Sequence, residues 1–175
     1  MFSFTILDHE SWNTELQPIL QRDVIAKLSL VLFPVTILLF ACQETPISPL
    51  SADQGVEFVL APGGSAIIKD TGLTINLISV LSDDRCPSEV ECAASGPVQL
   101  SLLAQKENGS AADIMMQTLT DNDGRSPDAE FEGITDRTVY EGYLIRIVGV
   151  LPYPENLSTS IQQNDYRVSF VVTKK

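Results

Sequence analysis

Apolar and polar positions alternate along most of the chain after residue 55, which is the pattern of β-strands buried on one face. Tyr166, Val168, Phe170 and Val172, for example, alternate with mostly polar neighbours. Similar short segments predict strands at residues 56–60, 65–69, 73–80, 98–102, 114–119, 143–151 and 166–173. No segment in this region keeps a helical spacing for more than two turns, so an all-β fold is expected.

The strand expected near residue 77 contains one irregularity. Leu73, Ile75 and Leu77 fall on one face, but the next apolar residues are Ile78 and Val80. Because side chains in a strand alternate between faces, a shift by one position indicates a β-bulge near Leu77 and Ile78.

Turn-forming residues separate the expected strands. Pro-Gly-Gly occurs at 62–64, Asp-Thr-Gly at 70–72, Glu-Asn-Gly at 107–109 and Asp-Gly at 123–124. About seven short strands in about 120 residues predict an immunoglobulin-like two-sheet β-sandwich. This domain is expected to cover residues 55–175.

A different pattern precedes this domain, an uncharged apolar run over residues 28–40 that leads to Cys42. Basic residues lie before the run and a small residue follows it, as in a secretory signal. The ending Leu-Phe-Ala-Cys is typical of a lipobox, which predicts a bacterial lipoprotein signal peptide at 24–41 and a lipid on Cys42. A membrane-spanning helix is the alternative, but it needs roughly 20 apolar residues, and Pro34 interrupts this shorter run.

Two flanking segments complete the predicted organisation. Residues 1–23 contain acidic side chains, which signal sequences avoid, so this segment is interpreted as a mis-assigned start region. Residues 42–54 hold the lipidated cysteine followed by prolines and small polar residues, which predict a flexible tether. The mature protein is therefore expected in the cell envelope, anchored on the extracytoplasmic side of a bacterial membrane.

The composition excludes several classes of function. The chain has 23 acidic and 11 basic residues, a net charge of −12, which disfavours binding to nucleic acid. Its single histidine and single tryptophan, His9 and Trp12, both precede Cys42. The predicted mature chain therefore lacks the histidine of Ser-His-Asp and Cys-His nucleophile systems and of most transition-metal sites, and no cofactor is expected.

Cys86 and Cys92 form the remaining cysteine pair. In an oxidising compartment such a pair is expected to be a disulfide, which contributes about 2 kcal/mol for so short a loop in the chain-entropy model. Two free thiols or half of a metal site are the alternatives, although the mature chain holds no further cysteine or histidine to complete a tetrahedral site.

The residues around this pair resemble a group of uncharacterised bacterial secreted lipoproteins. The block Asp83-Asp84-Arg85-Cys86-Pro87, followed by Cys92, Gly96 and a predicted strand, is similar to their Asp-Ser-Arg-Cys-Pro and cysteine block. Segments 72–75 and 152–168 are similar to that group as well. Asp84 stands where serine is usual, and Ala94-Ser95 stand where Trp-Ala is common. The resemblance implies a secreted β-sandwich with a disulfide-linked loop, and it implies no activity.

The cysteine loop is the first candidate site. It carries a set of charged side chains, Asp83, Asp84, Arg85, Glu89 and Glu91. These residues suit a rigid recognition loop or a cation site, because binding loops are often held on rigid scaffolds. The structural alternative makes Arg85 the ion-pair partner of a neighbouring carboxylate and gives the disulfide only a bracing role.

A second acidic segment matches part of a calcium-binding loop. Asp121, Asp123 and Glu132 correspond to positions 1, 3 and 12 of the EF-hand loop. Arg125 stands at position 5, where a ligand is needed, and Ser126 stands at position 6 in place of glycine. The match is therefore weak, and a solvated loop is the preferred interpretation.

These observations favour a non-catalytic, lipid-anchored module that binds a partner or stabilises the envelope, with an envelope protein or a glycan as the partner. A carboxylate-dependent hydrolase and a calcium-dependent adhesion module are the alternatives. A hydrolase would need two carboxylates within about 10 Å in a concave site, whereas the Asp and Glu residues of this chain lie mainly in expected turns and loops.

Overall fold

The computed structural model describes residues 48–158 and 160–175, which belong to a compact unit of Ile47–Lys175. The predicted signal peptide and the lipidation site Cys42 lie outside the described residues. No helix within the described part of the chain is long and apolar enough to cross a membrane.

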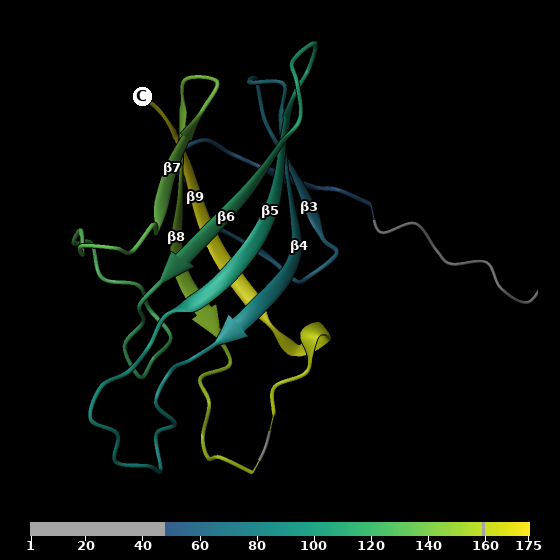
Figure 1. Ribbon diagram of the computed structural model, residues 1–175. Coiled ribbons are helices and arrows are strands. Elements are labelled where there is room, and N and C mark those ends of the chain that lie inside the picture. Colours follow the sequence, from purple (N-terminus) through teal and green to yellow (C-terminus); the bar gives the residue numbers. More distant parts are fainter. Residues whose placement is uncertain (1–47, 159) are drawn as a thin grey trace, which may run out of the picture. The chain divides into compact units, whose positions relative to one another are not determined.

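The described chain forms two β-sheets (Figure 1). One sheet has the strand order β1-β3-β4-β5-β6, with β1 (Leu50–Ala52), β3 (Ser65–Ile68), β4 (Leu73–Asp83), β5 (Val98–Lys106) and β6 (Ala112–Thr118). The other has the order β2-β9-β8-β7, with β2 (Phe58–Leu60), β9 (Arg167–Lys174), β8 (Tyr143–Leu151) and β7 (Arg137–Tyr140). A short 3₁₀ turn, η1 (Gln163–Asp165), precedes β9.

One hydrophobic core lies between the two sheets. In β5, Val98, Leu100, Leu102 and Ala104 are buried and alternate with more exposed residues, as the pleat of a half-buried strand requires. Phe170 from the opposite sheet is fully buried and packs near Phe58, with ring centroids 6.0 Å apart. The all-β class and the two-sheet sandwich are therefore confirmed.

The bulge expected after Leu77 is present. Leu77 pairs with Leu102 and Ser79 pairs with Ser101, so Ile78 is the extra residue and its side chain is exposed. A second register shift follows between Val80 and Ser82. The first shift lets β4 keep both Leu77 and Val80 in the core although an odd number of positions separates them.

The connectivity differs from the expected immunoglobulin-like type. Strands β3 to β6 follow one another as a four-stranded meander, and β7 to β9 form a second meander beside β2. In the immunoglobulin order one sheet instead joins the first, second, fifth and fourth strands. Alternation along each strand predicts which face is buried, but it carries no information on which strands become neighbours.

Part of the segment expected to be a tether, residues 42–54, belongs to the first sheet. Strand β1 lies inside this segment and pairs in parallel with β3, with Leu50 opposite Ala66 and Ala52 opposite Ile68. Ala52 is buried, and its carbonyl accepts a hydrogen bond from the Lys69 amide. The folded unit therefore begins before Gly55, because backbone pairing along the edge of β3 orders a segment with few apolar side chains.

The two ends of the sandwich differ in the length of their connections. Short turns at 69–72, 107–111 and 141–142 join strands at one end, which is at the top of Figure 1 and is called the hairpin end here. The long connections 84–97, 119–136 and 152–166 leave strands β4, β6 and β8 at the other end, the loop end. Loops on such a scaffold are the usual position of binding residues.

Candidate binding surface at the loop end

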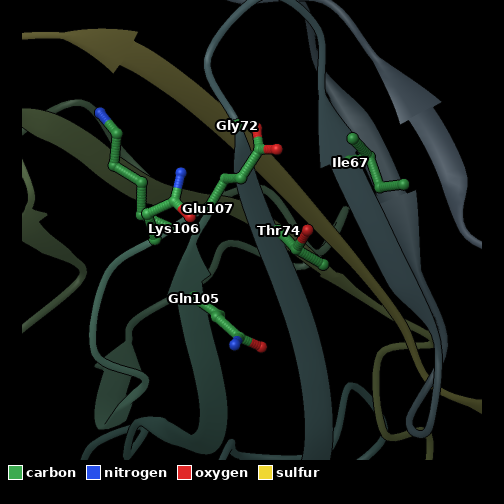
Figure 2. A pocket seen from close by; sticks show the side chains of 7 residues that line it. Ile67, Gly72, Thr74, Gln105, Lys106 and Glu107 are labelled. Atoms are coloured by element: carbon green, nitrogen blue, oxygen red, sulfur yellow. The ribbon is translucent and has the colours of Figure 1, made fainter.

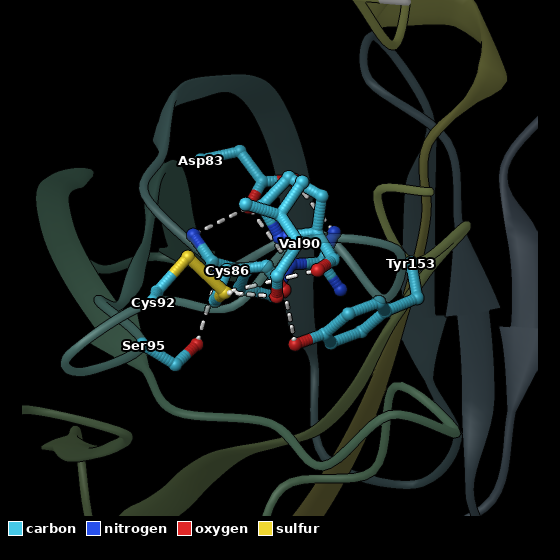
Figure 3. The surroundings of a disulfide bond; sticks show 8 residues. Asp83, Cys86, Val90, Cys92, Ser95 and Tyr153 are labelled. Atoms are coloured by element: carbon cyan, nitrogen blue, oxygen red, sulfur yellow. Dashed lines mark hydrogen bonds and ion pairs between the residues drawn. A yellow bond between two sulfur atoms is a disulfide. The ribbon is translucent and has the colours of Figure 1, made fainter. Parts of the chain in front are cut away.

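The cysteine pair closes a short loop in the connection between β4 and β5 (Figure 3). The sulfur atoms of Cys86 and Cys92 are 2.10 Å apart and their Cα atoms are 6.0 Å apart, so the two residues form a disulfide. Cys92 is exposed at the surface, and Pro87 between the cysteines is buried. The pairing agrees with the disulfide expected from the sequence.

Arg85, directly before the disulfide, is buried and holds the loop to the rest of the domain. Its side chain is 0% exposed, and that of its partner Asp83 is 11% exposed. Arg85 Nε donates to Asp83 Oδ1 over 2.8 Å, and Nη2 donates to Asp83 Oδ2 over 2.6 Å. This bidentate geometry is the strong form of an arginine–carboxylate pair, because two parallel charge-assisted hydrogen bonds fix the guanidinium plane.

The remaining donors of Arg85 reach other loops. Nη1 donates to the Val150 carbonyl over 2.8 Å and lies 3.5 Å from the Thr120 hydroxyl, whereas Nη2 also donates to the Pro152 carbonyl over 2.8 Å. A guanidinium has five N–H donors, and this geometry gives each of them an acceptor. One side chain thus links the ends of β4, β6 and β8.

Two tyrosines complete the surroundings of this ion pair. The Arg85 guanidinium carbon lies 4.9 Å from the centroid of the Tyr153 ring, and the Tyr153 hydroxyl donates to the Cys86 carbonyl over 2.8 Å. The Tyr166 hydroxyl donates to Asp83 over 3.1 Å. Burial of the phenol, with a further contribution from the Asp83 carboxylate, raises the pKa of Tyr166 to about 12.

Backbone hydrogen bonds join the cysteine loop to the connection between β8 and β9. The amides of Ser88 and Glu89 donate to the carbonyls of Pro154 and Glu155, over 3.0 and 2.9 Å. At the stem of the loop, the Gly96 amide donates to the Asp84 carbonyl over 2.9 Å. A Cβ atom at Gly96 would lie 2.7 Å from that oxygen, so this close approach requires glycine.

The third long connection, 119–136, is held against the four-stranded sheet. The Ser126 amide donates to the Val148 carbonyl, and Gly124 accepts from the Val150 amide, so this segment continues the sheet beside β8. Asp136 is buried and receives a hydrogen bond from Arg137 Nε over 3.0 Å. Arg146 pairs with exposed Asp128 over 2.8 Å.

The five charged residues proposed for the recognition loop fall into two groups. Asp83 and Arg85 are turned inward and pair with each other, which is the structural alternative considered for Arg85. Asp84, Glu89 and Glu91 are exposed to solvent. The exposed carboxylates therefore project from a loop whose position is fixed in part by the inward ion pair between Asp83 and Arg85.

The structure does not assemble the calcium candidates into a cluster. Asp121 uses its side chain to accept hydrogen bonds from the amides of Asp123 and Arg125, over 3.0 and 2.8 Å. Arg125 itself pairs with Glu57 over 2.7 Å. Across the described residues, no three side chains of His, Cys, Asp or Glu are grouped so as to hold a metal ion, so Glu132 does not join Asp121 and Asp123 in a three-ligand site.

A shallow hollow of about 320 Å³ lies far from these residues, at the hairpin end (Figure 2). Thr74 and Gln105 lie side by side in its floor, with Ile67 on one side and Lys106 and Glu107 at its upper rim. It is open to solvent and holds a single carboxylate, so it lacks the paired acid and base that hydrolysis by carboxylates requires.

The contacts of Arg85 include partners that the sequence did not indicate. The pairing of Arg85 with a nearby carboxylate was one of two interpretations of the sequence. Val150 and Pro152 accept through main-chain carbonyls, which every residue has, so nothing in the sequence marks them as partners. Comparison with models of protein families, with curated proteins and with solved structures gives no match to the chain.

Proposed function

We propose that the protein is a lipid-anchored, extracytoplasmic binding module that presents its loop end to a protein partner in the bacterial cell envelope. In this proposal residues 24–41 are a lipoprotein signal peptide and Cys42 carries the lipid. The β-sandwich acts as a non-catalytic scaffold. The observation that carries the proposal is the buried, fully hydrogen-bonded Arg85, which links three strand ends beside the disulfide loop. The outer side chains of that loop, Asp84, Glu89 and Glu91, face solvent.

A rigid loop end suits recognition because little conformational entropy is lost when a partner binds. The disulfide, the Arg85 pair and the backbone bonds to residues 154 and 155 limit the motion of the cysteine loop before any contact is made. Such preorganisation increases affinity by lowering the cost of ordering the interface. Immunoglobulin variable domains use loops at one end of a sandwich in the same way, although the connectivity here is different.

The exposed side chains at this end indicate the chemistry of the partner. Glu89, Glu91 and Glu155 project acidic groups, and Leu157 in the neighbouring loop is 81% exposed. Carboxylates beside an apolar side chain fit a protein surface that combines basic and apolar residues, since charge complementarity steers such partners together. A glycan fits less well, because Tyr153 stacks on Arg85 and its hydroxyl is already bonded.

Site-specific photo-crosslinking in intact cells tests the proposal. A photoreactive residue at Leu157 should give a discrete protein adduct, and the same residue at Asn108, an exposed position at the hairpin end, should not give that adduct. Introducing Glu89→Lys and Glu91→Lys should abolish the Leu157 adduct while the protein remains folded and present in the membrane fraction. An adduct that persists after charge reversal, or that forms equally from Asn108, would contradict a loop-end recognition surface.

A further inference from the structure

The outer face of the five-stranded sheet carries almost no charge. Four residues of β5 alternate with the buried positions of the strand and therefore point away from the core, namely Gln99, Ser101, Leu103 and Gln105. The strand register places outward residues of the two neighbouring strands beside them, Thr74, Asn76 and Ser79 of β4 and Asp113, Met115 and Gln117 of β6. Among these outward residues Asp113 alone is charged, and it lies on the edge strand β6.

The outer face of the four-stranded sheet is charged instead. Arg137 of β7 lies opposite Arg146 of β8, and both side chains contact the exposed Asp128, over 3.6 and 2.8 Å. The whole chain has 23 acidic and 11 basic residues. The neutral face is therefore a local feature of β4, β5 and β6 and does not follow from the composition.

Most polar groups along the middle of this neutral face are available to a ligand. Asn76 donates to the Leu103 carbonyl over 3.3 Å, and Gln117 donates to the Gly133 carbonyl. Within residues 48–158 and 160–175, no hydrogen bond involves the side chains of Thr74, Gln99, Ser101 and Gln105. A carboxamide has two donors and an acceptor, and a hydroxyl both donates and accepts. The face thus offers donors and acceptors together without charge.

Two shallow hollows lie at opposite ends of this face. The hollow at the hairpin end has Thr74 and Gln105 in its floor (Figure 2). A second hollow, of about 280 Å³, is lined by Gln99, Met115 and Gln117 toward the loop end. Gln99 and Gln105 are six positions apart on β5, which is roughly 20 Å at about 3.3 Å per residue. A linear ligand that lies along β5 would reach both hollows.

The charged groups near the two hollows lie at the margins of the face. Lys106 and Glu107 are at the upper rim of the first hollow, as Figure 2 shows. The Lys106 ammonium lies 4.7 Å from the centroid of the Tyr143 ring, which belongs to the other sheet. Between the hollows, the outward side chains of β5 are those of Ser101 and Leu103. The path along β5 is therefore neutral.

From the neutral face, its free hydroxyl and carboxamide groups and the two hollows, we propose that the outer face of β4, β5 and β6 binds a linear, uncharged glycan that lies along β5. Sugar hydroxyls both donate and accept hydrogen bonds, and they carry no charge that an acidic protein would repel or attract. A protein partner fits less well, because protein interfaces rely on aromatic and arginine anchors. The apolar side chains on this face are the separate Ile67, Leu103 and Met115. This site is distinct from the proposed loop-end surface.

Saturation-transfer difference NMR with the full-length protein in a sugar-free detergent tests this proposal. The probes are two neutral hexasaccharides, one of β-1,4-linked glucose and one of β-1,4-linked N-acetylglucosamine, and the anionic hexamer of galacturonic acid. At least one neutral probe should bind, and its Kd should be the same at low and high salt because no ion pair forms. The anionic hexamer should bind more weakly, because it brings further carboxylates to an acidic protein.

Paired substitutions locate the binding site. Gln99→Ala with Gln105→Ala should raise the Kd of the neutral probe by roughly an order of magnitude, because two hydrogen bonds are lost. Gln54→Ala with Gln162→Ala, at exposed positions away from this face, is the matched control and should leave the Kd unchanged. Circular dichroism checks that both variants fold. Failure of both neutral probes to bind, salt-sensitive binding, or equal loss in the two double variants would overturn the proposal. A dimer that Met115→Lys dissociates, without glycan binding, would assign the face to a second copy of the chain instead.

Discussion

Arg85 shows how one residue can decide the structure of a whole surface. Its charge is buried, and its guanidinium satisfies the Asp83 carboxylate together with two main-chain carbonyls. Lysine could not replace it, because an ammonium group lacks the planar fork that contacts both carboxylate oxygens. The Arg-Cys-Pro block was recognisable in the sequence, and the ion pair was one of its interpretations. The distant carbonyl partners of Arg85 depend on the fold, so they could not be predicted from this sequence block.

Replacing Arg85 should destabilise the domain far more than replacing an exposed arginine. Arg85→Ala leaves the Asp83 carboxylate buried without its partner, and we expect it to lower the free energy of unfolding by about 3–5 kcal/mol. Arg125→Ala is the matched control, since it breaks an ion pair whose side chains are 53% and 38% exposed and should cost about 1 kcal/mol or less. Urea denaturation measures both values, and equal losses would contradict the role assigned to Arg85.

The raised pKa of Tyr166 predicts a separate alkaline transition. Its folded value of about 12 exceeds the ordinary value of 10.0, so the neutral phenol is favoured in the folded state. The associated stability is complete below pH 10 and decreases as the pH rises from 10 through 12, because the unfolded chain loses this proton first. Ultraviolet titration of tyrosinate should therefore show a late phase that Tyr166→Phe removes. Titration of all tyrosines together near pH 10 would contradict the buried pairing with Asp83.

At the scale of the elements, strongly alternating strands were predictable and weakly patterned edge strands were not. β5 and β9 bury every second side chain, and the bulge in β4 appears as a shift in the same alternation. The short edge strands β1 and β7 escaped prediction because they bury one residue and none, respectively. Both strands are held in place by backbone pairing, β1 with β3 and β7 with β8. Backbone pairing does not require alternating side-chain polarity, so the sequence shows no strand pattern at these positions.

The disulfide is expected to add stability to the loop without being required for the fold. Replacing both Cys86 and Cys92 by serine should lower the free energy of unfolding by about 2 kcal/mol, the chain-entropy estimate for a loop of this length. The Arg85 contacts and the backbone bonds to residues 154 and 155 remain, so the double variant should keep a cooperative transition. Circular dichroism during thermal and urea unfolding tests this, and loss of cooperative folding would show that the disulfide is essential.

At the scale of the whole molecule, a two-sheet sandwich carries the disulfide loop at one end, and in our proposal a lipid on Cys42 anchors the sandwich to a membrane. The sequence predicted the scaffold class and the cysteine pair, and the structure adds the arrangement of the loops and the exposed carboxylates gathered at the loop end. Surface charge at a given end depends on which turns become neighbours, so it could not be read from the order of residues alone.

The mass of the mature amino-terminal peptide tests the central claim most directly. Protein purified from the membrane fraction of the native host should begin at Cys42, and that residue should carry two or three acyl chains, enough for stable anchoring. The variant Cys42→Ser should not be lipidated and should leave the membrane fraction, although its β-sandwich still folds. An unmodified amino terminus at Cys42, or a mature chain that retains residues 1–41, would contradict the account.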